Sequence, residues 1–70
     1  MTSEKLFLSY MIQNDIEDYR ELSNKTKIEY TRLRKRIHHP ETLRMFELRA
    51  LDDVLHFSDE HIIWLTRGGD

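Results

Sequence analysis

Apolar residues near the start of the chain recur at the spacing of a helix. An i, i+1, i+4, i+5 pattern places four side chains on one helical face: Leu6, Phe7, Tyr10 and Met11. Ser3 precedes them and can accept a hydrogen bond from an amide that a helix start leaves unpaired. The pattern therefore predicts a first helix near residues 4–13.

The rest of the chain carries almost none of the residues that form hairpins. Glycine is confined to Gly68 and Gly69, and the only proline is Pro40. Apolar positions at helical spacing recur between these points. The sequence therefore predicts an all-α fold of five short helices, near residues 4–13, 17–25, 28–38, 41–55 and 59–67.

Polar residues mark the expected helix boundaries. Asp15 or Asp18 can cap the second helix. Pro40 should end the third helix and open the fourth, because it disfavours the α conformation in the preceding residue but fits a first helical turn. Ser58 can cap the fifth helix, and Gly68 can close it. Five helices in 70 residues leave no room for a linker, so we expect one domain, residues 1–70.

Composition narrows the function of so small a domain. The chain has no cysteine, which excludes disulfides, thiolate zinc sites and cysteine nucleophiles. Its longest apolar run, Ile62 to Leu65, is far shorter than the roughly 20 residues of a membrane-spanning helix. The N-terminus lacks the basic region and apolar stretch of a signal peptide. We therefore expect an intracellular, cytoplasmic protein.

Charge is distributed unevenly along the chain. The net charge is -2, yet residues 25–39 carry six cations and one acid, which leaves -7 for the other 55 residues. The six cations are Lys25, Lys27, Arg32, Arg34, Lys35 and Arg36. A charge run can be merely a solvated helix face. Here it follows a short helix and a tight turn, which indicates a binding surface for an anionic partner.

Residues 19–38 resemble the helix-turn-helix of phage Cro and repressor proteins. Leu22 lies at the apolar position of the first helix, and the small residue Ser23 follows where the two helices approach closely. Ile28 comes just after the turn and Leu33 five residues later, at positions where that family has aliphatic residues. The resemblance implies a compact five-helix domain of the lambda-repressor-like type that contains a helix-turn-helix.

Two residues depart from the family pattern. Lys27 stands at a turn position that is often glycine, so we expect it to adopt a positive φ at some energetic cost. Arg36 occupies a place that is frequently apolar, and we expect Ile37 to take over the packing role. Neither departure removes the implied fold.

The resemblance also implies that the third helix is a recognition helix. With Ile28, Leu33 and Ile37 facing inward, the outward residues would be Glu29, Tyr30, Thr31, Arg34, Lys35 and His38. Arg34 and Lys35 suit guanine in the major groove, and Tyr30 or Thr31 could reach a phosphate, a base edge or a thymine methyl.

The other basic side chains of this region are expected to contact phosphates or an acidic partner: Lys25, Lys27, Arg32 and Arg36. Glu29 does not fit this scheme, because its carboxylate would repel a phosphate. Glu29 therefore points either to a contact with cytosine N4 or to a partner that is not DNA.

The last two helices carry more apolar residues than one buried face requires. The fourth has two stripes, one of Leu43, Phe46, Ala50 and Val54 and one of Met45, Leu48, Leu51 and Leu55. Burial of a central helix on several sides would account for part of this excess. The remainder predicts an apolar interface with a second copy or another protein, for which the candidates are Met45, Leu48, Ile63 and Trp64.

Two segments, Asn14–Tyr19 and Tyr30–Arg34, are similar to the phage modulators of repression, also called antirepressors. These regulators of the lysis–lysogeny switch in temperate phages of Gram-positive bacteria pair with the repressor of the same phage. The resemblance implies binding to the repressor's N-terminal DNA-binding domain in the bacterial host cytoplasm, with loss or change of operator binding. Glu29 would then pair with a repressor arginine. The alternative is a Cro-like repressor that binds operator DNA directly as a dimer.

Other chemistry has little support in the sequence. The four histidines lack the i, i+4 spacing of two metal ligands on one helix: His38, His39, His56 and His61. The paired acids Asp52–Asp53 and Asp59–Glu60 have no nucleophile or phosphate-binding loop near them in the sequence. We expect no enzyme activity, cofactor, metal or small-molecule substrate.

Overall fold

All regular secondary structure is helical in the computed structural model, which describes residues 2–69. The five α-helices are α1 (Ser3–Gln13), α2 (Tyr19–Thr26), α3 (Tyr30–His38), α4 (Met45–Leu55) and α5 (Asp59–Thr66). A short 3-10 helix, η1 (Pro40–Thr42), precedes α4. No strand occurs within residues 2–69. The predicted all-α class with five helices is confirmed.

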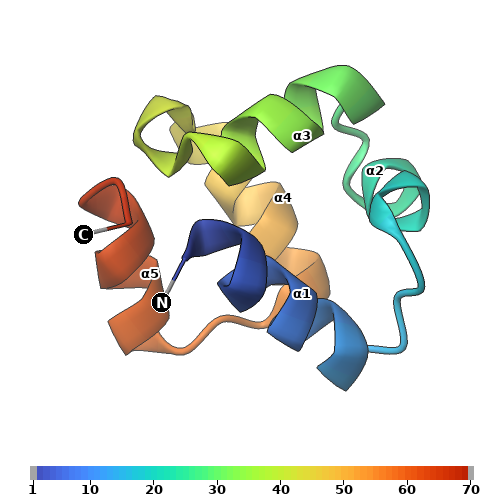
Figure 1. The fold of residues 1–70 in the computed structure, drawn as a ribbon, viewed down its shortest axis with the longest axis horizontal. Coiled ribbons are helices and arrows are strands. Elements are labelled where there is room, and N and C mark those ends of the chain that lie inside the picture. The colour runs from blue at the N-terminus through green and yellow to red at the C-terminus, as the bar shows by residue number, and fades with distance from the viewer. Residues whose placement is uncertain (1, 70) are drawn as a thin grey trace.

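The helices pack around one apolar core. Figure 1 shows α1 and α4 in the middle of the molecule, α2 and α5 at opposite ends and α3 along one side. The apolar residues of α1 to α4 that are completely excluded from solvent are Phe7, Leu22, Leu33, Ile37 and Leu51. Phe57, in the link before α5, meets Phe7 edge to face with ring centroids 5.6 Å apart. Since helices of 8 to 11 residues are marginal alone, this packing holds them in place.

Side-chain caps fix the starts of α1, α2 and α5. Thr2, rather than the expected Ser3, caps α1, and its hydroxyl accepts the Lys5 N–H at 3.2 Å. Asp18, one of the two expected residues, caps α2. Ser58 caps α5 as predicted.

The end of α5 depends on its two glycines. Gly68 and Gly69 have φ angles of +79° and +81°. The Gly68 N–H donates to the Leu65 carbonyl and the Gly69 N–H to the Trp64 carbonyl, each at 3.0 Å. This pair of bonds is a Schellman motif, and it satisfies two carbonyls that a helix end leaves unpaired.

The predicted helix over residues 41–55 is wrong in its first part. The chain makes the 3-10 turn of η1, and then Leu43 and Arg44 are extended, with ψ angles of 133° and 157°. The α4 helix begins only at Met45. The cause is Glu47, whose side chain accepts the Arg44 N–H at 2.8 Å and so fixes the helix start.

The buried face of α4 does not follow the predicted stripe that contains Phe46. Glu47, Leu51 and Leu55 are buried, whereas Phe46 is 62% exposed and Met45 is 68% exposed. Phe46 therefore does not pack in the core, although it belongs to one of the two predicted stripes. With Glu47 turned toward α3, the neighbouring Phe46 must point about 100° away around the helix, into solvent.

Glu47 ties α4 to α3 through an ion pair. Its carboxylate has no exposed surface and accepts hydrogen bonds from Nε of Arg32 at 2.6 Å and Nε of Arg36 at 3.2 Å. Burial alone would raise the pKa of this carboxyl. The Arg44 N–H and the two guanidinium groups lower it by more than burial raises it, so the pKa lies below the ordinary 4.5. Glu47 is therefore ionised at neutral pH.

Left-handed backbone conformations occur at the ends of α2 and α4 and in the link between α1 and α2. Lys27 ends α2 with φ 65°, His56 ends α4 with φ 56°, and Asp15 between α1 and α2 has φ 58°. The positive φ predicted for Lys27 is confirmed. The Lys27 N–H still donates to the Ser23 carbonyl at 2.9 Å, as the last i to i−4 bond of α2, and the positive φ then turns the chain toward α3.

Substitution Glu47→Gln should lower the free energy of unfolding by about 2 kcal/mol at pH 7, since charge-assisted hydrogen bonds to both arginines are lost. The pKa of Glu47 is lower in the folded state than in the unfolded state. The stability that its charge contributes is therefore complete above the unfolded-state pKa and is lost as the pH falls through the folded-state pKa. The gap between wild type and variant should therefore shrink from pH 5 to pH 3 in chemical denaturation. The exposed-site variant Asp53→Asn serves as control, and an unchanged gap at pH 3 would contradict the ion-pair explanation.

Substitution Lys27→Gly should raise the free energy of unfolding by about 1 kcal/mol relative to Lys27→Ala. Both variants remove the lysine side chain, so their difference isolates the left-handed conformation at this position. Thermal and urea unfolding measure it. Equal stability of the two variants would show that the turn stores no such strain.

Candidate functional site

A three-residue link, Lys27 to Glu29, joins α2 to α3 and fixes the angle between them. The Ser23 hydroxyl donates to the Ile28 carbonyl, which ties α2 to the link. Leu22 and Leu33 are fully buried and Ile28 is 6% exposed, so the two helices share an aliphatic contact. The inward positions predicted for Ile28, Leu33 and Ile37 are confirmed by their burial.

Glu29 lies just before α3 and caps it. The helix begins at Tyr30, two residues later than predicted, and the Glu29 Oε2 atom accepts the Thr31 N–H at 2.6 Å. This backbone hydrogen bond lowers the pKa of the Glu29 carboxyl. The exposed start of α3 therefore carries a negative charge at neutral pH, at the end of the helix where the dipole favours it.

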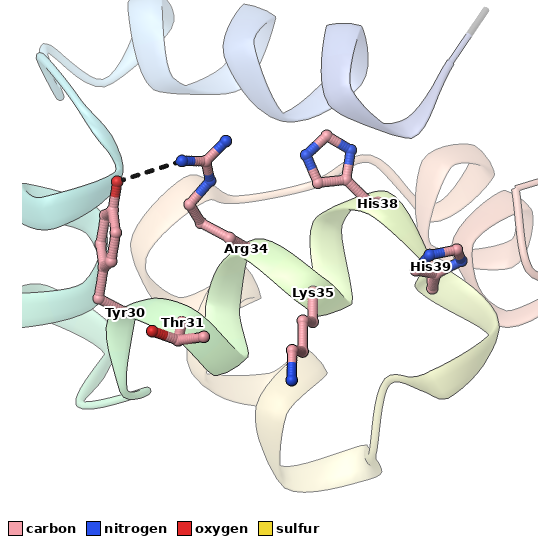
Figure 2. A pocket seen from close by; sticks show the side chains of 6 residues that line it. All are labelled: Tyr30, Thr31, Arg34, Lys35, His38 and His39. Atoms are coloured by element: carbon pink, nitrogen blue, oxygen red, sulfur yellow. Dashed lines mark hydrogen bonds between the residues drawn. The ribbon is translucent and has the colours of Figure 1, made fainter.

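The outward face of α3 carries the predicted side chains. Thr31, Arg34, Lys35 and His38 are exposed, and Tyr30 is half-buried. Together with His39 they line an open depression of about 430 Å³. Figure 2 shows Arg34 and His38 on the side of α3 that faces α1, whereas Lys35 points the opposite way. Because the cations diverge, this face suits an extended partner surface better than a small ligand.

Tyr30 is held by arginines rather than presented freely to a partner. The Arg20 guanidinium stacks over its ring at 4.6 Å, and the Arg34 Nη1 atom donates to its hydroxyl at 3.5 Å. Arg34 also lies 5.8 Å from the ring of Tyr19. Sequence analysis missed Arg20, because its contact with Tyr30 arises only when α2 packs against α3.

The six cations of the basic segment divide into two groups. Arg32 and Arg36 were expected to contact phosphates, but their Nε atoms bind Glu47, and their side chains are 43% and 20% exposed. Lys25, Lys27, Arg34 and Lys35 are exposed. Of the four cations expected to contact phosphates or an acidic partner, Arg32 and Arg36 are thus tied to Glu47 within the molecule, whereas Lys25 and Lys27 are not.

Acidic side chains lie beside the histidines at the end of α3. The His38 Nδ1 atom is 3.8 Å from Oε2 of Glu4, in the first turn of α1. The His39 Nδ1 atom is 3.3 Å from Oε1 of Glu41. Together with Glu29, these acids place negative charge at both ends of α3, with Arg34 and Lys35 between them.

The predicted apolar interface residues are only partly exposed. Met45 and Ile63 are 68% and 53% exposed, whereas Leu48 and Trp64 are half-buried against the core. Sequence periodicity missed other exposed apolar side chains, which are Ile12, Phe46 and Leu8. The sequence does not show whether another helix covers the faces on which these residues lie. Their exposure becomes clear only from the packing of the helices.

Within residues 2–69, no group of three or more metal-binding side chains is placed to hold an ion. No helix in this range is long and apolar enough to cross a membrane. The exposed α3 face, with its cap and its neighbours on α2, is the candidate site.

Comparison of the chain with protein-family models, with curated proteins and with solved structures found no significant match.

Proposed function

We propose that α2 and α3 form a helix-turn-helix of the Cro/repressor type and that the chain acts as a modulator of repression. In this role the outward face of α3 binds the DNA-binding domain of a phage repressor and blocks its contact with the operator. Two helices joined by three residues, with buried Leu22, Ile28 and Leu33 between them, support the motif.

The charge of Glu29 is the observation that favours a protein partner over DNA. Its carboxylate is exposed at the start of α3, where a recognition helix meets the edges of bases and the phosphates beside them. The lowered pKa keeps this group ionised at neutral pH. DNA would meet it as a repulsive charge, whereas an arginine on a repressor's own DNA-reading surface would form an ion pair with it.

The layout of the α3 face supports the same proposal. A repressor surface that reads DNA carries cations for phosphates and polar groups for base edges. Against such a surface, Glu29 supplies an anion, and Glu4, 3.8 Å from His38, supplies another at the far end of α3. Arg34 and Lys35 between them would meet acidic or carbonyl groups of the partner.

Direct operator binding is the second candidate, and the exposed cations favour it. Lys25, Lys27, Arg34 and Lys35 lie on α2, the link and α3, the elements that would approach a DNA duplex. Arg34 and Lys35 can donate to guanine O6 and N7. This candidate requires a dimer to place two α3 helices one helical turn of DNA apart.

One substitution separates the two candidates, because its expected effects are opposite. Glu29→Lys should weaken the complex with a repressor N-terminal domain at least tenfold, since an ion pair becomes a repulsion. If α3 binds DNA instead, the same change should strengthen operator binding, since a phosphate-repelling charge becomes an attracting one. Titration calorimetry with the repressor domain and gel-shift assays with operator DNA at 50 and 200 mM salt measure the two effects.

The control is Glu60→Lys, which makes the same charge change in the exposed first turn of α5, at the far end of the molecule from α2 (Figure 1). It should leave the repressor complex unchanged. If the unsubstituted protein forms no complex with the repressor domain, the modulator proposal fails. If it gives no operator shift at 50 mM salt, direct DNA binding fails.

A further inference from the structure

A groove runs along α4 on the side that faces the C-terminal end of α2. One hollow, of about 370 Å³, is lined by Phe46 and Ala50 of α4 and by residues 26–29 and Arg32. A second, of about 330 Å³, is lined by Val54 of α4 together with Asn14, Ile16 and Lys25. Phe46, Ala50 and Val54 are four residues apart, so the hollows lie end to end along one helical face. We call this surface the α2–α4 groove.

The floor of the α2–α4 groove is apolar and only partly covered by the rest of the molecule. Phe46 is 62% exposed, and Ala50 and Val54 are half-buried. Ile28 and Ile16, otherwise buried, contribute their edges. Apolar surface gathered in a concave strip of this kind is typical of a protein-docking site.

Cations line the rim of the groove. Lys25 and Lys27 are exposed on the α2 side. Arg32 lies at the Phe46 end, with its guanidinium 5.8 Å from the Phe46 ring. The Arg32 Nε atom donates to Glu47 at 2.6 Å. This bond restricts rotation of the Arg32 side chain, so its terminal nitrogens keep one orientation.

Acids on the groove do not cancel this charge. The acidic residues that line the two hollows are Glu29 and Glu47. Glu47 is buried between two arginines, and the exposed Glu29, which caps α3, is outnumbered on the groove by Lys25, Lys27 and Arg32. The groove therefore combines an apolar floor with a basic rim, and a complementary occupant must be apolar on one side and acidic on its flanks.

We propose that the α2–α4 groove docks an acidic amphipathic helix of a partner protein. Two apolar side chains of that helix would contact Phe46 and Val54, which lie about 12 Å apart along α4, so they should be seven or eight residues apart. Carboxylates beside them would face Lys25, Lys27 and Arg32. This site shares no lining residue with the depression on the α3 face, but it meets the proposed binding surface at Glu29, which lines the groove and lies just before α3.

A second copy of this chain is a poorer occupant. Besides α4, the helices that expose large apolar side chains are α1 and α5. The α1 helix carries one acid and one base, whereas α5 combines Asp59 and Glu60 with exposed Ile63 and lies at the opposite end of the molecule from α2 (Figure 1). Docking of α5 into the groove of another copy would be head to tail and would build an open chain unless the rotation closed a ring. Nucleic acid is also a poorer occupant, because its phosphates would meet donors only at the rim and none on the apolar floor.

The test is selection of a random twelve-residue peptide display library against the full-length protein. Enriched peptides should carry net negative charge and two apolar residues seven or eight positions apart. A synthetic enriched peptide should shift the amide signals of Ala50, Val54 and Lys25 in heteronuclear NMR, and its affinity should fall as salt rises. Failure to enrich acidic peptides, or signal changes confined to residues 30–39, would overturn the proposal.

Substitutions sharpen the same test. Ala50→Glu places a charge on the groove floor and should weaken peptide binding at least tenfold, as should the double charge reversal Lys25→Glu with Lys27→Glu. Lys35→Glu makes the same kind of reversal on the α3 face and should leave peptide binding unchanged. Circular dichroism checks that each variant folds. If Ala50→Glu does not fold, the double variant Lys25→Glu with Lys27→Glu tests the groove in its place. Equal binding by all variants, or self-association in sedimentation that Ala50→Glu abolishes, would refute a separate partner helix.

Discussion

The arrangement of α3 and α4 depends on one buried carboxylate. Glu47 has no exposed surface, and burial of a lone carboxylate would cost several kcal/mol. It is tolerated here because Arg32, Arg36 and the Arg44 N–H all donate to it. Arg32 and Arg36 are four residues apart and lie on one face of α3. Their shared acid therefore fixes the rotation of α3 about its axis, and that rotation decides which side chains of α3 face solvent.

The same ion pair makes the six cations of the basic segment unequal. Counted along the sequence they form one positive run, but Glu47 neutralises part of the charge of Arg32 and Arg36 and holds them close to α4. The outward field of α3 is then set by Arg34 and Lys35, with Glu29 at the start of the helix. A face with both signs of charge is complementary to a partner that also carries both signs. Protein surfaces carry both, whereas the DNA backbone carries only negative charge.

Local patterns predicted most of the fold, and contacts distant in sequence account for the rest. Helical spacing placed α1, α2, α3 and α5 within about two residues, the usual uncertainty of a helix end. The φ of Lys27 and the inward side chains of α3 were expected from the resemblance of residues 19–38 to the Cro/repressor helix-turn-helix, and both are confirmed. The start of α4 and the roles of Arg32 and Arg36 were not expected, because Glu47 lies 15 and 11 residues from its two arginines. For the site, the outward face of α3 was predictable, but the stacking of Arg20 on Tyr30 was not.

Glu47 contributes geometry more than stability, and the exposure of Phe46 shows why. Replacement of a buried ion pair by well-packed apolar residues is often neutral or stabilising in proteins. An apolar residue in place of Glu47 would release Arg32 and Arg36, and α3 could then rotate until other residues packed against α4. With Glu47 in place, α4 is held in the rotation that leaves Phe46 in solvent, and Arg32 is held 5.8 Å from its ring. One buried acid thus shapes both the α3 face and the α2–α4 groove, so the two surfaces keep a fixed relation to each other as long as the ion pair is intact.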